Sequence, residues 1–279
     1  MPKTTTATFR QKKAGGDKIT MLTAYDHATA RICDEAGIDS LLVGDSLGMT
    51  ILGYETTLPV TMEEMLHHTK AVTRGAENAL VVADMPFMSY QSGTKQALEN
   101  AGRFMKEALA EAVKLEGGLE VAPTVSKLVS CGIPVVGHIG LTPQSVHQLG
   151  GYKVQGRELD QARKLLNDAI ALDEAGAFAI VLECVPAPLA ALVSEKVGAA
   201  TIGIGAGPGC DGQVQVISDI LGLAGPKLPK HAKRYANLGA AMAEAIAGYA
   251  TEVRESAFPG RENSFEIDGR VIEDLRGEL

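Results

Sequence analysis

The chain has 279 residues, of which 46% are hydrophobic, and this share can bury the core of one large domain or two small ones. Its 26 basic and 34 acidic residues leave a net charge of −8. This acidity disfavours nucleic acid or an anionic membrane as a partner, because both require a basic face. No apolar run approaches the roughly 18 residues that span a bilayer.

The N-terminal segment 1–16 is basic but lacks the apolar stretch of a secretory signal. The cysteines are widely scattered and form no C-x-x-C pair; they are Cys33, Cys131, Cys184 and Cys210. Such thiols are typical of a reducing compartment, where they serve as small core residues and not as a zinc site. We therefore expect a cytoplasmic protein.

Short apolar runs typical of strands alternate along the chain with helical patterns. The predicted strands are 19–26, 40–45, 79–86, 111–117, 133–140, 177–184, 200–207 and, with a less regular pattern, 214–223. The predicted helices are 27–36, 61–75, 94–109, 120–131, 158–175, 187–197 and 233–255. Segment 141–157 is long and irregular for a loop, which indicates a functional or interface role. Residues 266–279 are predicted to form an acidic, solvated C-terminal tail.

Strands that are nearly continuous hydrophobic runs, mostly followed by helices, are typical of a parallel sheet covered by helices. Eight such units favour the α/β class and a (β/α)8 TIM barrel that occupies residues 1–265 as a single catalytic domain. An open, doubly wound sheet is the structural alternative. Nothing in the sequence marks a second domain.

Polar side chains stand at the carboxyl ends of five consecutive predicted strands: Asp45, Asp84, Glu116, His138 and Glu183. A period of two residues places Val43 on the face of Asp45 and Val82 on the face of Asp84, while Leu42 faces the helices. Barrel enzymes carry their chemistry at the carboxyl ends of the strands. We therefore predict that these five side chains point into the barrel mouth.

Each of these residues also has an ordinary structural explanation. An aspartate at a strand end, such as Asp45 or Asp84, is often a turn or cap residue. A single histidine is often a core residue whose ring nitrogens are hydrogen-bonded inside the protein. Lys114 and Glu116, on one face of a strand, can form an internal ion pair. The common register of five strands favours a site over coincidence.

The residue types indicate metal-assisted chemistry on a 2-oxo acid. Two aspartates and a glutamate supply the oxygen ligands that suit Mg²⁺, and Lys114 adds positive charge for an anionic substrate. A chelating 2-oxo acid would use the metal together with Lys114 or His138, and the metal would stabilise an enolate. Glu183, farther round the barrel, is the natural base for the adjacent C–H proton.

The glycine-rich stretch IGIGAGPGCDGQ, residues 202–213, does not match the dinucleotide fingerprint G-x-G-x-x-G. Counting from Gly203 places Pro208 at the sixth position, and counting from Gly205 places Cys210 there. No βαβ unit follows it. A ligand loop and a tight turn both remain open interpretations of this stretch.

Eight strings occur in order at consistent spacing over residues 5–265, and together they resemble the ketopantoate hydroxymethyltransferase family. They are VGDSLGM (43–49), TLPVT (57–61), ADMPFMSY (83–90), VKLEGG (113–118), GHIGLTPQSV (137–146), GGYKVQGR (150–157), LECVP (182–186) and IGIGAG (202–207). The resemblance implies a barrel enzyme that transfers a one-carbon unit from the co-substrate 5,10-methylenetetrahydrofolate to 3-methyl-2-oxobutanoate. The product would be 2-dehydropantoate, on the route to pantothenate and coenzyme A.

Matched position by position, the resemblance implies that Mg²⁺ is held by Asp45, Asp84 and Glu116. The residues that contact the oxo acid would be Asp45, Ser46, Asp84 and Lys114, with His138 beside it. Glu183 would be the catalytic proton acceptor. The resemblance further implies a ring-like homo-oligomer, a decamer.

Departures from the family pattern avoid these site residues. His231 stands where an aromatic residue is common, Ala-Ala at 199–200 replaces the usual Ile-Pro, and the chain continues past the usual end near Ser264. The nearest alternative function is that of another Mg²⁺-dependent 2-oxo acid enzyme, of the isocitrate lyase and phosphoenolpyruvate mutase type. The cysteine-containing loop of those enzymes is not seen. A non-catalytic metabolite-binding barrel would not need Glu183 at the end of an apolar strand.

Overall fold

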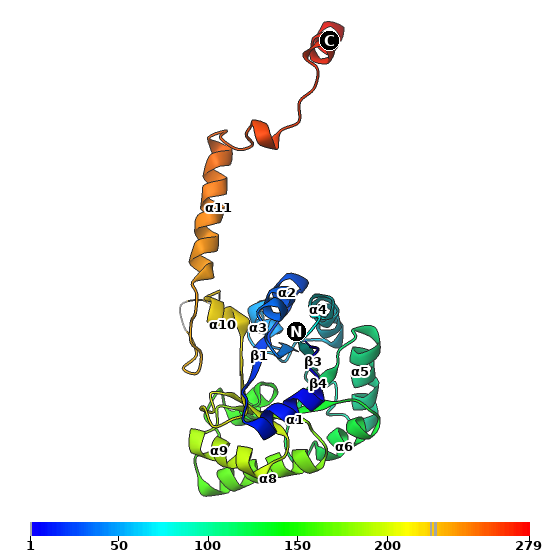
Figure 1. The fold of residues 1–279 in the computed structure, drawn as a ribbon, viewed down its shortest axis with the longest axis vertical. Coiled ribbons are helices and arrows are strands. Elements are labelled where there is room, and N and C mark those ends of the chain that lie inside the picture. Colours follow the sequence, from blue (N-terminus) through cyan, green and yellow to red (C-terminus); the bar gives the residue numbers. More distant parts are fainter. Residues whose placement is uncertain (1, 224, 226–227) are drawn as a thin grey trace.

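The core of the molecule is a closed barrel of eight parallel strands in sequential order, in a computed structural model that describes residues 2–223, 225 and 228–279 (Figure 1). The strands are β1 (Ile19–Thr23), β2 (Ser40–Val43), β3 (Leu80–Asp84), β4 (Ala112–Glu116), β5 (Val135–Gly140), β6 (Ala179–Glu183), β7 (Ala200–Ile204) and β8 (Gly212–Gln215). Strand β1 pairs with β8 and closes the barrel, with Met21 opposite Val214. The predicted (β/α)8 fold is confirmed, and the open-sheet alternative is wrong.

Six helices follow the first six strands and cover the barrel, close to the predicted bounds. They are α2 (His27–Glu35), α4 (Met62–Gly75), α5 (Thr94–Glu107), α6 (Ala122–Ser130), α8 (Leu159–Glu174) and α9 (Ala187–Lys196). Helix α4 shows why such boundaries can be predicted: Thr61 and Glu64 form a reciprocal capping box at its start. The short helix α3 (Leu47–Thr50) follows β2, and the predicted irregular segment after β5 contains η1 (Pro143–Ser145) and α7 (Val146–Leu149).

Apolar side chains form two layers, one inside the barrel and one between the strands and the helices. Val82, Val136 and Val181 belong to the inner layer, as the period of two predicts. The prediction is wrong for β2, where Leu42 lies in the inner layer and Val43 packs with the helices. The reason is that β2 ends at Val43 and Asp45 lies in the turn that follows, so the strand period does not extend to Asp45.

The amino-terminal end of the barrel is covered by α1 (Thr6–Gly15), a helix that the sequence analysis missed. Phe9 is fully buried, and its ring meets the ring of Phe178 edge-on at 5.2 Å between centroids. Lys13 Nζ lies 2.8 Å from an oxygen of Asp211, just before β8. The helix therefore closes the end of the barrel opposite to the strand-end residues.

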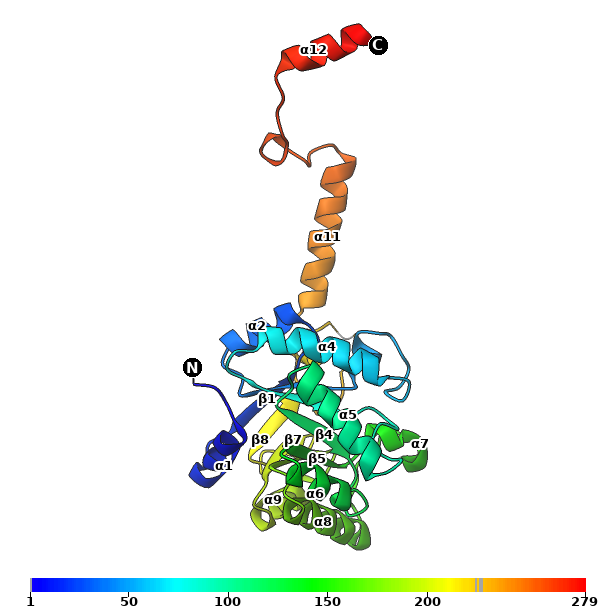
Figure 2. The same cartoon turned by 90° about the vertical axis from the view of Figure 1, so that its right-hand side faces the viewer.

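The C-terminal part of the chain leaves the barrel. The predicted strand 214–223 is wrong from residue 216 onward, because β8 ends at Gln215 and α10 (Ile217–Leu221) follows, its first N–H bonded to Thr23 Oγ1. Helix α11 (Leu238–Arg254) then projects away and leads through η2 (Arg261–Asn263) to α12 (Gly269–Glu278) (Figures 1 and 2). Helix α12 lies within the segment predicted as a solvated tail, and its residues are exposed. Within the described residues, every helix is too short or too polar to cross a membrane.

Candidate active site

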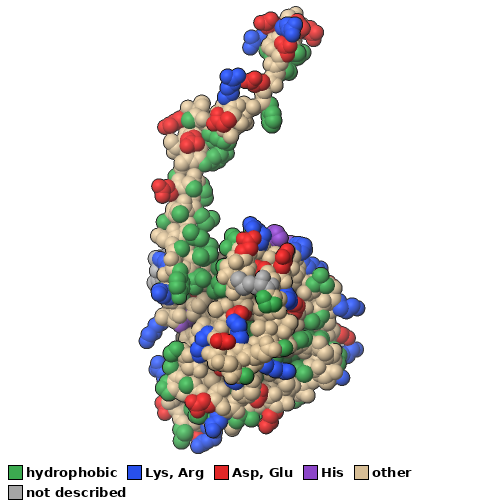
Figure 3. Space-filling model, in the orientation of Figure 1, with side chains coloured by type: hydrophobic (Ala, Val, Ile, Leu, Met, Phe, Trp, Pro, Cys, Tyr) green, Lys and Arg blue, Asp and Glu red, His purple; other side chains and the backbone are tan. Residues whose placement is uncertain are grey.

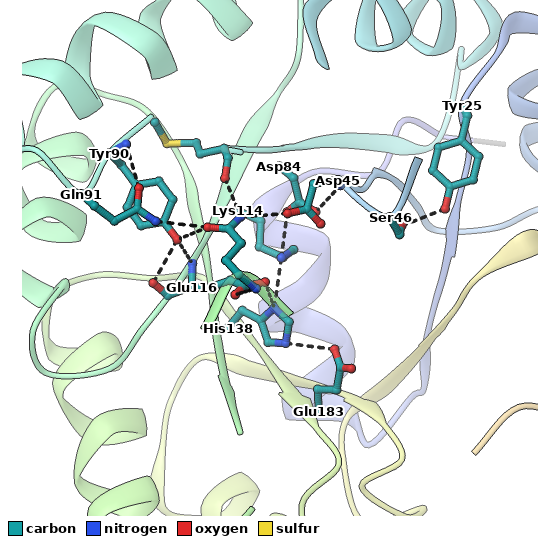
Figure 4. Close-up of polar contacts among 12 residues, drawn as sticks. Tyr25, Asp45, Ser46, Asp84, Tyr90, Gln91, Lys114, Glu116, His138 and Glu183 are labelled. Carbon is teal, nitrogen blue, oxygen red and sulfur yellow. Dashed lines mark hydrogen bonds and ion pairs between the residues drawn. The ribbon is translucent and has the colours of Figure 1, made fainter. Parts of the chain in front are cut away.

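The residues predicted at the strand ends converge at the carboxyl end of the barrel (Figure 4). Asp84, Glu116 and Glu183 are the last residues of β3, β4 and β6, and His138 lies in β5. Asp45 lies in the turn after β2. Among Asp84, Lys114, Glu116, His138 and Glu183, the side chain of Glu183 is the most accessible, at 15%, whereas the others are almost completely enclosed. The structure therefore brings the strand-end residues together, while their roles in a site stay a prediction.

Lys114 is the cation of this site. Its ammonium lies 2.8 Å from Asp84 Oδ1 and 3.1 Å from His138 Nδ1, and it is buried. Burial alone would lower the pKa of Lys114, but the charges of Asp84, Glu116 and Asp45 outweigh burial and raise it. Lys114 therefore remains charged, and Asp84 is its direct partner.

His138 connects Lys114 with Glu183. Burial and the Lys114 charge lower the pKa of His138 well below its ordinary value, so the imidazole is neutral. Since Lys114 has only protons to donate, His138 Nδ1 accepts, and we infer that Nε2 carries the ring proton. His138 Nε2 lies 3.2 Å from Glu183 Oε2, near enough for an interaction but not aligned as a hydrogen bond.

Glu183 has a carboxyl group suited to accept a proton near neutral pH. Burial raises the pKa of Glu183 to about 7, and the nearby Lys114 and His231 side chains partly offset this rise. Its main chain is fixed on both sides: Leu141 N–H donates to the Glu183 carbonyl at 2.8 Å, and Cys184 N–H donates to Ile204. Cys184 adopts a φ of 50°, a sparsely populated conformation for a residue other than glycine. Such strain is common where a functional side chain must be aimed.

Ser46, the remaining predicted substrate contact, stands apart from this cluster. Its hydroxyl lies 2.9 Å from the Tyr25 hydroxyl, and Figure 4 shows this pair beyond Asp45, on the side away from Glu183. Ser46 is partly exposed at the start of α3. Its role toward a substrate stays a prediction.

Gln144, in the turn η1, is a buried site residue that the sequence analysis missed. Its side-chain NH₂ donates to Asp45 Oδ2 at 2.9 Å, and its main-chain N–H donates to Glu116 Oε2 at 3.0 Å. The Tyr90 hydroxyl donates to Gln144 Oε1 at 2.8 Å. Gln144 lies inside the string GHIGLTPQSV, but it is uncharged and lies in a loop. A prediction based on polar residues at the ends of strands therefore does not select it.

Asp45, Asp84 and Glu116 are buried carboxylates whose oxygens are potential metal ligands. Burial, and then the charge of Asp84, raise the pKa of Asp45 to about 7, and burial also raises the pKa of Glu116 well above its ordinary value. In the part of the chain that the structure describes, no three His, Cys, Asp or Glu side chains stand close enough together to hold a metal ion. Mg²⁺ commonly takes one or two carboxylates and keeps several waters, so the chemistry of the set fits this ion.

A pocket of about 800 Å³ adjoins Glu116. It lies between the loops that follow β4 and β5 and reaches α8, and its lining includes Tyr90, Gln144 and Lys164. Its volume is in the range of pockets that enclose a cofactor-sized ligand.

The closed barrel and the buried acid, lysine and histidine cluster at its carboxyl end define an enzyme of the (β/α)8 class. The profile of the family described as ketopantoate hydroxymethyltransferase matches residues 3–261. The chain belongs to this family.

Two relatives share this assignment, both called 3-methyl-2-oxobutanoate hydroxymethyltransferase. The protein from Carboxydothermus hydrogenoformans is 59% identical over 275 residues, which cover 99% of this chain and 100% of the relative. The protein from Dehalococcoides mccartyi strain 195 is 58% identical over 274 residues, which cover 98% and 97%. The family that the eight strings indicated is thereby confirmed.

Solved structures with low sequence identity share the fold. A phosphoenolpyruvate phosphomutase from Streptomyces platensis aligns with a TM-score of 0.60 at 15% identity, over 98% of this chain and 95% of that one. A phosphonopyruvate hydrolase in complex with oxalate and Mg²⁺ aligns with a TM-score of 0.57 at 13% identity, over 99% and 95%. At such identity the likeness concerns the fold alone.

Proposed function

We propose that the chain transfers a hydroxymethyl group from 5,10-methylenetetrahydrofolate to 3-methyl-2-oxobutanoate, giving 2-dehydropantoate in pantothenate and coenzyme A biosynthesis. Family membership and the names of the relatives support this activity. The observation that carries the mechanism is the array in the barrel mouth in which His138 contacts Lys114 on one side and Glu183 on the other. This array places a cation for an oxo acid beside a base with a near-neutral pKa.

The proposal includes Mg²⁺, held by Asp45 and Asp84 with Glu116 as the third predicted ligand. The phosphonopyruvate hydrolase that binds oxalate and Mg²⁺ on the same fold supports this metal. When bound, Mg²⁺ would supply Lewis-acid stabilisation of the negative charge that develops when the oxo acid is deprotonated.

The protein side chains have distinct proposed roles. Lys114 and Ser46 bind the anionic oxygens of the oxo acid, and the two aspartates, which have no proton to donate when ionised, would contact it through the bound Mg²⁺. Ionised Glu183 removes the proton from C3, and C3 then forms a bond to the methylene carbon of the folate as one C–N bond breaks. Water supplies the hydroxyl group as the second C–N bond breaks, and tetrahydrofolate leaves. His138 contacts both Lys114 and Glu183 and so maintains their separation when the substrate lies beside it.

The folate co-substrate is proposed to occupy the pocket beside Glu116. The pocket is contiguous with the site, since Glu116 and Gln144 belong to both. Tyr90 and Phe87 offer apolar surface to a planar ring, and Lys164 offers charge toward a carboxylate. The pairing of Lys164 with Asp168 at 2.6 Å means that such a contact would compete with an existing ion pair.

The remaining proposals concern assembly and location. A homo-oligomer, with a decamer as its predicted size, is supported by the exposed apolar side chains of α11. The cytoplasm remains the predicted compartment, and all four cysteines are free, which is consistent with a reducing environment. The division of the chain at residue 265 likewise remains a prediction.

The test of the mechanism is hydrogen exchange at C3 of 3-methyl-2-oxobutanoate in D₂O with Mg²⁺ and without folate. Wild-type protein should catalyse the exchange, and Glu183→Gln should slow it by roughly 100-fold or more while oxo-acid binding survives. Glu195→Gln, on the exposed side of α9, is the matched control and should exchange at the wild-type rate.

Binding without exchange in the wild type would contradict an enzymatic role for Glu183 and favour a binding protein. Failure to bind this oxo acid would favour a different 2-oxo acid, as in enzymes of the phosphoenolpyruvate mutase and isocitrate lyase type. Addition of the folate should then convert the exchanging oxo acid to 2-dehydropantoate.

A further inference from the structure

The loop after β5 carries Gln144 across the barrel mouth. The loop starts at Gly140, which has a φ of 94° and approaches the Glu183 carbonyl so closely that a side chain would collide with it. Leu141 N–H then bonds that same carbonyl, and Gln144 reaches the opposite wall. One short segment therefore connects the strand of the proposed base with the carboxylates that follow β2 and end β4.

The side-chain amide of Gln144 has a single favourable orientation. Its oxygen accepts from the Tyr90 hydroxyl at 2.8 Å and from Gln91 Nε2 at 3.2 Å. Its NH₂ donates to Asp45 Oδ2 at 2.9 Å and to the Met85 carbonyl at 3.0 Å. Exchanging the oxygen and nitrogen would place donors against donors and acceptors against acceptors. The amide NH₂ is therefore held toward Asp45.

Tyr90 contributes to this orientation because its own hydroxyl is fixed. The Glu116 main-chain N–H donates to the Tyr90 oxygen at 3.0 Å, and the Tyr90 proton has Gln144 Oε1 as its nearer acceptor at 2.8 Å and the Glu116 carbonyl as its farther one at 3.2 Å. Figure 4 shows Tyr90 and Gln91 on one side of Glu116, across from Lys114 and Asp84. The support of Gln144 thus comes from the loop after β3, independently of Lys114.

Gln144 holds the two carboxylates that Lys114 does not bind directly. Lys114 pairs with Asp84, whereas Asp45 and Glu116 each give one oxygen to a Gln144 donor. Each of these two carboxylates thereby keeps its second oxygen for another partner. Groups that orient metal-binding carboxylates in this way typically change metal affinity about 10–100-fold when they are lost.

We propose that Gln144 is a positioning residue for the Mg²⁺ site. Its side-chain amide fixes the carboxylate of Asp45, and its main-chain N–H fixes the carboxylate of Glu116. The inference rests on the proposed function to the extent that this site binds Mg²⁺. It does not require Gln144 to touch the metal or the substrate.

The test is the Mg²⁺ affinity of Gln144→Met, measured by calorimetry on the full chain without either substrate. Methionine keeps the length of the side chain and removes its hydrogen bonds. We expect affinity to fall about 10–100-fold. The thermal unfolding midpoint should fall as well, because Tyr90 and Asp45 lose a buried hydrogen-bond partner, so affinity is measured below it. Gln148→Met is the matched control, because within the described residues its exposed side chain makes no hydrogen bond, and it should bind Mg²⁺ as the wild type does.

A second variant tests the support of the amide. Gln91→Met should weaken Mg²⁺ binding only modestly, and it should have no further effect in the Gln144→Met background, because Gln91 acts through Gln144. If Gln144→Met does not fold, Tyr90→Phe, which retains the ring, takes its place and should also weaken Mg²⁺ binding.

The possible results separate this inference from the proposed function. A wild-type protein that binds no Mg²⁺ would overturn the metal part of the proposed function and this inference with it. A wild-type protein that binds Mg²⁺ while Gln144→Met binds it equally well would overturn this inference alone. Additive effects of Gln91→Met and Gln144→Met would overturn the orienting role assigned to Gln91.

Discussion

Glu183 lies in a buried environment that brings the pKa of its carboxyl group close to neutral pH. An ordinary glutamate with a pKa near 4.3 is a weak base toward a carbon acid. Burial raises the pKa of Glu183 to about 7, and Lys114 limits the rise. The carboxylate is therefore more basic than an exposed one and is still partly ionised at neutral pH.

C3 exchange of the oxo acid in D₂O should therefore depend on pH. Because only ionised Glu183 accepts the proton, the rate should rise through about pH 7 and level off above it. The measurement is the initial exchange rate at saturating Mg²⁺ and oxo acid across this range. The slow residual exchange of Glu183→Gln should lack this rise, and a wild-type rate that is flat with pH would contradict the assignment.

Residues that end strands could be predicted, whereas residues that support them from loops could not. Asp84, Glu116 and Glu183 are charged at the end of apolar runs, a contrast that is visible in one sequence. Gln144 carries no charge, and its importance depends on an orientation set by distant Tyr90. The pairing of Lys114 with Asp84 could not be predicted either, because it depends on the register of β3 against β4, which sets these two residues opposite each other.

At the scale of elements, the two ends of the barrel have different roles. The amino-terminal end is packed against α1, whereas the carboxyl end holds the candidate active site. The helix α1 packs on the amino-terminal end, where Lys12 and Lys13 pair with Asp39 and Asp211. The sequence did not predict α1, because its only large apolar residue is Phe9 and its remaining residues are mostly polar. Helix α10 was missed for a different reason: a short apolar run fits a strand or a buried helix equally well.

Phe9→Ala should destabilise the barrel without changing the chemistry. Loss of a fully buried aromatic side chain leaves a cavity against Phe178 and typically costs about 3–5 kcal/mol of unfolding free energy. Urea denaturation measures this loss, and the C3 exchange rate of the folded variant should match that of the wild type. Phe265→Ala, at a fully exposed position, is the control and should leave the unfolding midpoint unchanged. Equal midpoints for the two variants would show that α1 does not stabilise the barrel.

At the scale of the whole molecule, α11 extends from the barrel with an apolar side uncovered. Figure 3 shows hydrophobic side chains along this arm, and none of the α11 residues is buried. The exposed apolar residues recur at helical spacing: Leu238, Met242, Ile246, Tyr249 and Val253. A continuous apolar stripe on a surface helix indicates a binding partner, and in a homo-oligomer the partner is another copy of the chain. Such an assembly could not be predicted from the periodicity of a single chain, because the same stripe would also fit a helix packed on its own barrel.

Charging this stripe should therefore break the proposed assembly while the barrel stays folded. In Met242→Glu/Ile246→Glu, two buried contacts of the proposed interface become unpaired carboxylates, which are costly to desolvate. We expect light scattering after size exclusion to give a multi-subunit mass for the wild type and a smaller mass for the double variant. Glu244→Gln lies on the same helix between the two positions, is already exposed, and should retain the wild-type mass. A monomeric wild type, or a double variant with the wild-type mass, would contradict the role of α11 in assembly.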